Sequence, residues 1–159
     1  AVKPASAGSP ARIITSPGAG GGPHVRLFDY LGNPDLSFFA YDATFVGGVT
    51  VSVMNGDSAN YSIVTTPASK GGPDIRIFNS QGQLTEGRKA YESWWRGGYH
   101  TAASGNTVYI VSDGRRTSIR TVVGSFSGNN GNWWETGNGT TDPGSGTGSC
   151  GRRRCWWGN

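Results

Sequence analysis

The feature that most restricts the fold is an internal repeat with a constant offset of 50 residues. Residues 13–17 (IITSP) return at 63–67 (IVTTP), and residues 21–28 (GGPHVRLF) return at 71–78 (GGPDIRIF). Two shorter blocks recur at the same offset: Ala40-Tyr41-Asp42 with Ala90-Tyr91-Glu92, and Gly47-Gly48 with Gly97-Gly98. A repeat of roughly 40–50 residues made of short apolar runs is typical of propeller blades and other stacked β-units.

Each repeat is predicted to contain four short strands. The expected strands are 12–16, 24–28, 36–41 and 49–53 in the first copy, and 63–67, 74–78, 88–94 and 99–103 in the second. Apolar and polar residues alternate in the run 24–28, and Gly, Asn and Pro between the runs supply turns. A third, eroded copy is expected, because 109–112 aligns with 62–65 and 118–122 aligns with 74–78.

These strands predict an all-β fold with two clear repeats and one degenerate repeat, each four-stranded and propeller-like. The β-repeat domain is expected to cover 13–124, divided into 13–60, 61–106 and 107–124 onward. Residues 1–12, rich in Ala, Ser and Pro, are predicted to form an extended N-terminal arm. Residues 125–159 are predicted to form a Gly- and Trp-rich tail.

Charge and hydropathy restrict the partners. The formal net charge is +4, and five arginines stand in two runs, Arg115-Arg116 and Arg152-Arg153-Arg154. Without them the chain is close to neutral, whereas a nucleic-acid binder usually carries a broader basic face, so no nucleic-acid partner is expected. No apolar run approaches ~18 residues, so no membrane span is expected either.

The two cysteines, Cys150 and Cys155, are predicted to form a small disulfide loop. A metal site needs about four ligands, commonly from paired Cys-x-x-Cys elements, and that pattern is missing. The alternative is two free thiols in a reducing cell. A disulfide favours an oxidising compartment. The first residues resemble a mature terminus left after cleavage, or a boundary chosen for expression. The expected location is therefore secreted or on the extracellular surface.

The run 17–29 (PGAGGGPHVRLFD), followed by 38–42 (FFAYD) and 47–49 (GGV), resembles the FG-GAP/VCBS-type repeat of bacterial and integrin-like β-propellers. The resemblance is close in the first repeat, clear in the second and faint in the third. It implies a secreted or surface protein used for adhesion, ligand binding or structure, and usually not an enzyme.

Many members of that family bind Ca²⁺ in a loop like Asp-x-Asn-Gly-Asp-Gly-x-x-Asp, whose oxygen ligands suit a hard cation. In this chain Asn55, Gly56 and Asp57 match the pattern, but Val53 and Tyr61 replace its first and last Asp. Asn55 and Asp57 are therefore interpreted as the remnant of a calcium loop. Neither Ca²⁺ nor another cofactor is expected.

The strongest candidates for interaction are three pairs of adjacent tryptophans: Trp94-Trp95, Trp133-Trp134 and Trp156-Trp157. Neighbours in a strand point to opposite faces, so one ring of each pair would face the core and the other would face solvent or a partner. The alternative is that all six rings are anchors within the chain. The Cys150–Cys155 loop with Arg152, Arg153 and Arg154 is expected to be an interaction tip.

No catalytic constellation is found in the sequence. His24 and His100 lie at non-equivalent repeat positions and are interpreted as ordinary strand histidines. The pattern Gly-x-Ser-x-Gly, typical of a hydrolase nucleophile, is absent. Asn60 and Asn138 each begin an Asn-x-Ser/Thr sequence and are candidate glycosylation sites.

Three repeats cannot close a ring, because closed propellers have about four to eight blades. Open sheet edges and ends favour pairing with further copies. The sequence therefore predicts a non-catalytic extracellular structural protein that assembles with copies of itself. It would form a surface layer, a filament or an oligomeric propeller through strand pairing and Trp-rich contacts. The alternative is a carbohydrate-binding lectin or adhesin module that uses exposed Trp to bind glycans.

Overall fold

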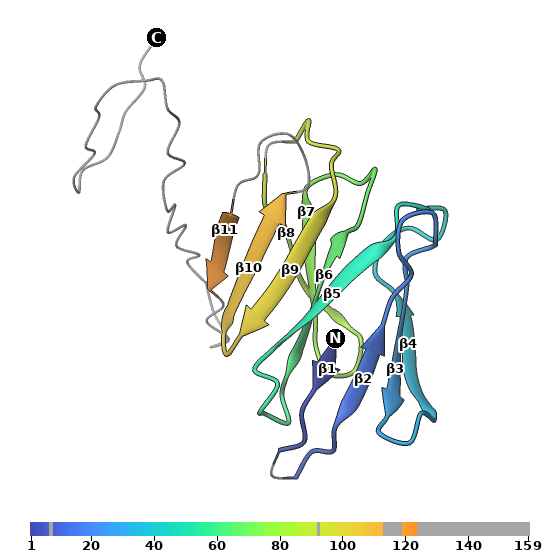
Figure 1. Cartoon of the computed structure of the whole chain (residues 1–159), viewed down its shortest axis with the longest axis vertical. Coiled ribbons are helices and arrows are strands. Elements are labelled where there is room, and N and C mark those ends of the chain that lie inside the picture. The colour runs from blue at the N-terminus through green and yellow to red at the C-terminus, as the bar shows by residue number, and fades with distance from the viewer. Residues whose placement is uncertain (7, 92, 113–118, 124–159) are drawn as a thin grey trace, which may run out of the picture.

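The structure, a computed structural model, describes residues 1–6, 8–91, 93–112 and 119–123 (Figure 1). Every regular element in these ranges is a β-strand, which confirms the all-β prediction. The part of the chain that the structure describes therefore contains no helix that could cross a membrane. The strands are β1 (Val2–Lys3), β2 (Arg12–Thr15), β3 (His24–Asp29), β4 (Pro34–Phe39), β5 (Val49–Met54), β6 (Ser62–Pro67), β7 (Asp74–Phe78), β8 (Leu84–Lys89), β9 (Tyr99–Ser104), β10 (Thr107–Ser112) and β11 (Ile119–Val123).

The strands form three antiparallel sheets in which neighbours in sequence are neighbours in space. The first sheet has the order β1-β2-β3-β4, the second β5-β6-β7-β8, and the third β9-β10-β11. None of these three described sheets closes on itself. Each is a simple meander, so the turns set the register; at one such turn Asn79 N–H donates to the carbonyl of Gln83 at 2.9 Å.

The four-stranded unit of the structure is shifted by one strand from the unit of the sequence. The repeat that begins at residue 13 contains β2 to β5, but β5 pairs with β6 and opens the second sheet. The first strands of the sheets, β1, β5 and β9, lie at the centre of the molecule in Figure 1, and β5 contacts both of the others. The sheets extend outward from these strands in different directions.

The second sheet is covered on both faces, and β6 is buried along its whole length. Ile63 belongs to a core between the first and second sheets, whereas its neighbour Val64 belongs to a core between the second and third. The first core contains Ile14, Val25, Leu27, Ala40, Val49, Tyr61, Ile63 and Phe78. The second contains Met54, Val64, Ile75, Ile77, Ala90, Tyr91, Tyr99, Val108 and Ile110. Successive sheets therefore stack face to face.

Two residues of the segment predicted as an extended N-terminal arm, Val2 and Lys3, lie in a sheet of their own chain. These residues form β1 and pair with β2 of the same chain, Val2 opposite Ile13 and Lys3 opposite Arg12. The Lys3 side chain is fully buried, and its ammonium donates to Ser9 Oγ at 3.0 Å and lies 5.8 Å from the ring centroid of Tyr61. Because polar partners and an aromatic ring hold this charge, the segment is fixed to its own first sheet.

The predicted strand 88–94 is wrong in position. The observed β8 ends at Lys89, so Trp94 and Trp95 lie in the loop between β8 and β9. The turn after β7 is tight, with Gly82 at φ 74°, and the next strand begins directly after it at Leu84. Trp94 and Trp95 therefore lie outside any strand that would turn their side chains to opposite faces.

Candidate functional site

A tyrosine after β4 joins the first sheet to the second. The Tyr41 hydroxyl donates to the carbonyls of Asp74 at 2.7 Å and Thr65 at 3.1 Å. The guanidinium of Arg76 lies 4.8 Å from the centroid of the Tyr41 ring, and its Nη1 donates to the carbonyl of Ala40 at 2.9 Å. One aromatic side chain and one arginine thus bind each other across the sheet–sheet contact through a cation–π contact and hydrogen bonds to the backbone.

The same position recurs in the next repeat. The Tyr91 hydroxyl donates to the carbonyl of Ile110 at 3.4 Å, and its ring stacks on Tyr99 at 5.2 Å between centroids. Tyr91 therefore joins the second sheet to the third as Tyr41 joins the first to the second. The position equivalent to Arg76 in the first sheet is Arg26, whose side chain is exposed.

Tyr41 makes folding sensitive to alkaline pH. Burial raises the pKa of Tyr41 well above its usual value, against smaller lowering effects from its hydrogen bond to Thr65 and the charge of Arg76. Because the pKa of Tyr41 is higher in the folded chain than in the unfolded chain, its contribution to the free energy of unfolding is fully present below pH ~10, the pKa of an unfolded tyrosine. That contribution is lost as the pH rises above this value. We expect Tyr41→Phe to cost about 1–3 kcal/mol at pH 7, since the carbonyls of Asp74 and Thr65 lose their donor.

The Tyr41→Phe variant should also lose less stability above pH ~10 than the unmodified chain. Urea unfolding between pH 7 and 11 measures both effects. Tyr30→Phe is the matched control, because Tyr30 is 67% exposed at the β3–β4 turn. If the free energy of unfolding fell equally with pH for Tyr41→Phe and for the unmodified chain, Tyr41 would not be the source of the alkaline sensitivity. Burial also raises the pKa of Tyr61, so some alkaline sensitivity remains in either case.

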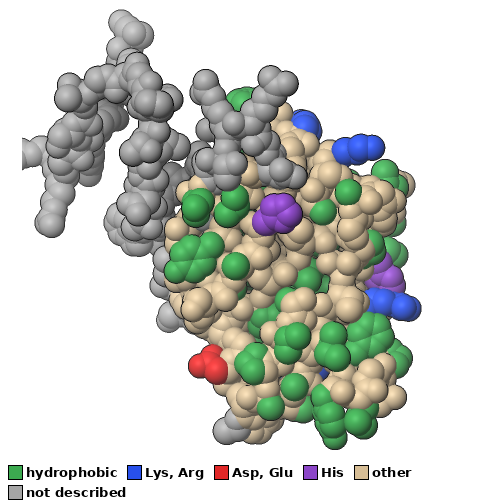
Figure 2. Space-filling model, viewed as in Figure 1, with side chains coloured by type: hydrophobic (Ala, Val, Ile, Leu, Met, Phe, Trp, Pro, Cys, Tyr) green, Lys and Arg blue, Asp and Glu red, His purple; other side chains and the backbone are tan. Residues whose placement is uncertain are grey.

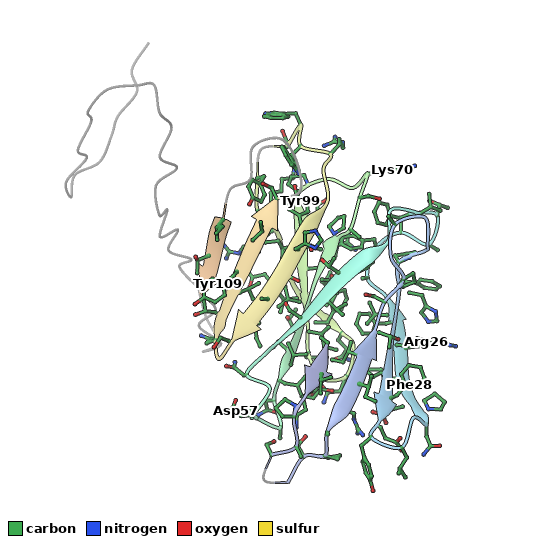
Figure 3. All side chains as sticks on the ribbon, in the orientation of Figure 1. Arg26, Phe28, Asp57, Lys70, Tyr99 and Tyr109 are labelled. Atoms are coloured by element: carbon green, nitrogen blue, oxygen red, sulfur yellow. The ribbon has the colours of Figure 1, made fainter. Side chains whose placement is uncertain are left out.

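The first sheet has one face that no other described element covers. We call this surface, formed by Ile13, Thr15, Arg26 and Phe28, the rear face of the first sheet. The register places Ile13 opposite Phe28 and Thr15 opposite Arg26. Figure 3 shows Arg26 and Phe28 on the free side of this sheet, away from the other two sheets. Ile13 is 40% exposed, although a strand isoleucine usually packs into a core.

The third sheet, at the other end of the stack, also has a face that no other element of the described ranges covers. We call this surface, formed by Tyr109, Val111, Ile119 and Thr121, the forward face of the third sheet. Tyr109 is 44% exposed and Ile119 is 61% exposed. Figure 3 places Tyr109 on the opposite side of the molecule from Arg26 and Phe28. Figure 2 shows hydrophobic side chains scattered among uncharged polar ones over the side between these two ends.

The predicted tryptophan pair at Trp94 and Trp95 divides between surface and core. Trp94 is 70% exposed, whereas Trp95 packs against the second core, 6.0 Å from the ring of Tyr91. The buried Nε1 of Trp95 has no hydrogen-bond partner among the described residues. The loop between β8 and β9 therefore exposes the indole ring of Trp94, while the ring of Trp95 fixes the loop to the second core.

The calcium-loop remnant contacts the neighbouring turn. Asn55 adopts φ 51°, its N–H donates to the carbonyl of Gly105 at 2.8 Å, and its side-chain amide donates to Asn106 Oδ1 at 3.4 Å. Asp57 is exposed in the same turn (Figure 3). The predicted glycosylation residue Asn60 is also exposed. Within the described ranges no three His, Cys, Asp or Glu side chains gather into a metal-binding group.

The remaining predicted site residues lie outside the described residues. These are Trp133, Trp134, Trp156, Trp157, Arg152, Arg153, Arg154, Cys150, Cys155 and Asn138. Tyr41 and Arg76, which join the first sheet to the second, were not predicted as site residues. The signal was present, because Tyr41 and Arg76 recur as Tyr91 and Arg26 at the offset of 50. A polar or aromatic residue that persists at one repeat position is expected to join consecutive units.

Comparison with known proteins adds no relative: no protein-family model matches the chain, and neither the curated proteins nor the solved structures give a match.

Proposed function

We propose that this chain is a non-catalytic, extracellular structural protein that assembles with copies of itself, and that its sheets are propeller-like blades. The resemblance of residues 17–49 to FG-GAP/VCBS repeats and the predicted Cys150–Cys155 disulfide support the extracellular location. The meander of each sheet and the central position of β1, β5 and β9 support the blade interpretation.

One observation carries the proposal: the stack of three described sheets is open at both ends. Apolar side chains remain exposed on the outer face of the first sheet and on that of the third, Ile13 and Ile119 among them. Large exposed apolar faces on a monomer mark surfaces that bind a partner. A second copy of the chain is the partner that fits these ends, because faces of the same kind already pack on each other within the stack.

The test is the assembly state of the full chain. Sedimentation velocity measures its mass in solution over a range of concentrations, with and without reductant, and negative-stain electron microscopy identifies rings, filaments or layers. We expect species larger than the 16.7 kDa chain. A protein that stays monomeric at every concentration in both redox states would contradict the proposal.

A second candidate function, glycan binding, is favoured by the exposed ring of Trp94. An exposed indole that is held at its base suits stacking on a sugar ring. If this function holds, Trp94→Ala should weaken binding in a glycan screen by about tenfold or more, while leaving the assembly state unchanged. Tyr30→Ala, also an exposed aromatic, is the control. Equal glycan binding by Trp94→Ala and the unmodified chain would exclude Trp94 as the platform.

A further inference from the structure

We propose that two copies of this chain close a ring of six sheets. In this ring the forward face of the third sheet of each copy packs on the rear face of the first sheet of the other. The inference deepens the proposed self-assembly and depends on it. It names the partner, a second copy, and the two surfaces that meet.

The contact between the first and second sheets shows how a rear face is covered. In the second sheet, the residues equivalent to Ile13, Thr15 and Phe28 are Ile63, Thr65 and Phe78. Ile63 and Thr65 are 0% exposed and Phe78 is 4% exposed, because the first sheet covers them. In the first sheet the same positions are exposed or only partly buried, and Ile13 reaches 40% exposure. The sequence thus repeats an interface whose first copy lacks its partner.

The forward face repeats in the same way. Val64 and Ile75 of the second sheet are 0% and 4% exposed beneath the third sheet. Their equivalents in the third sheet, Val111 and Ile119, are partly exposed and 61% exposed. The forward face of the third sheet therefore presents apolar side chains at positions that are buried in the second sheet.

Charge favours the contact of a forward face with a rear face over the contact of two rear faces. The four residues of the forward face are uncharged, whereas the rear face carries Arg26. Two rear faces in contact would bring two Arg26 guanidinium groups together, which is unfavourable. Arg76, at the equivalent position, is satisfied by a backbone carbonyl and an aromatic ring of the adjoining sheet. Arg76 thus shows that an arginine at this repeat position packs against an adjoining sheet through a backbone carbonyl and an aromatic ring.

The arrangement of the sheets favours closure by two copies. The first strands β1, β5 and β9 lie together at the centre of Figure 1, and the sheets extend outward from them. Two copies contribute six sheets, a number within the range of about four to eight that closed rings of sheets contain. A two-fold axis then produces both contacts at once, so no open end remains for further growth.

The test uses the full chain with one substitution on each face. Arg26→Glu alters the rear face, and Ile119→Asp alters the forward face; both side chains are exposed in the single copy, so the fold should persist. Leu31→Asp is the matched control, because Leu31 is 70% exposed at the β3–β4 turn and belongs to neither face. Circular dichroism and the thermal midpoint confirm that each variant is folded.

We expect the unmodified chain and Leu31→Asp to sediment with twice the mass of the 16.7 kDa chain. Arg26→Glu and Ile119→Asp should each weaken the dimer by about tenfold or more, because either change alters both contacts of the ring. Mixing the two variants should restore part of the dimer, since one of its two contacts is then unaltered on both faces.

Three outcomes would overturn the inference. Assembly that neither Arg26→Glu nor Ile119→Asp weakens would exclude these faces while leaving self-assembly in place. Species larger than two copies that both variants abolish would exclude the closed ring and show an open filament. A chain that is monomeric at every concentration would overturn the proposed self-assembly together with the ring.

Discussion

Replacing Gly98 by alanine is expected to lower the free energy of unfolding by about 2–4 kcal/mol. A Cβ added to Gly98 would lie 1.9 Å from the carbonyl oxygen of Ala68 and 2.9 Å from its carbonyl carbon. These are backbone atoms of the β6–β7 loop, so they cannot rotate away as the end of a side chain can. Urea denaturation followed by circular dichroism measures the change.

Gly87→Ala is the control for this prediction, because a Cβ at Gly87 would meet no atom within 4 Å. We expect its effect to stay within about 0.5 kcal/mol, as for other substitutions on an open surface. Equal effects of the two substitutions would contradict a close approach at Gly98. The first repeat makes the same approach at the equivalent residue, where a Cβ on Gly48 would lie 2.2 Å from the carbonyl oxygen of Gly18. The recurring Gly-Gly pairs therefore allow one loop to lie against the next.

Replacing Ile63 by alanine is expected to cost about 2–5 kcal/mol, because Ile63 is fully buried between the first and second sheets. Ile13→Ala changes the same residue type at the equivalent repeat position, where the side chain is 40% exposed. In the single copy it should cost about 1 kcal/mol or less. Denaturation at protein concentrations too low for assembly compares the two.

The two isoleucines should differ again when copies assemble. If the rear face of the first sheet is covered in the dimer, Ile13→Ala should weaken association, whereas its effect on the isolated chain stays small. Nearly equal effects of Ile13→Ala and Ile63→Ala on the isolated chain would show that the first sheet is covered within a single copy. That result would contradict the open stack.

Much of the strand pattern could be predicted from the sequence, because alternation and turn residues act locally. The strands at 24–28, 49–53 and 74–78 were expected within one residue of their observed bounds. The grouping of strands into sheets was not predictable in this way. A repeat of 50 residues fixes the period but not where one sheet ends and the next begins, which depends on which strands form hydrogen bonds.

The tryptophan prediction shows the same limit at the site. Trp94 and Trp95 do divide between solvent and core, but they do so in a loop and not in a strand. Two adjacent aromatic residues indicate that at least one of the rings is buried, but they do not indicate whether the rings lie on a strand or in a loop. The residues that join the sheets, Tyr41 and Arg76, required the alignment of one repeat on the next and the packing of whole sheets.

The one-strand offset between repeat and sheet has a consequence for how such a chain lengthens. β5 is the last strand of the first repeat in sequence and the first strand of the second sheet in space. The preceding repeat therefore supplies the first strand of the sheet that follows it. A gene segment that encodes 50 residues can therefore be duplicated in frame wherever it is cut, and each duplicate adds one complete sheet. A single excised repeat cannot form its native sheet for the same reason, because its last strand, β5 in the first repeat, pairs with β6 of the next repeat.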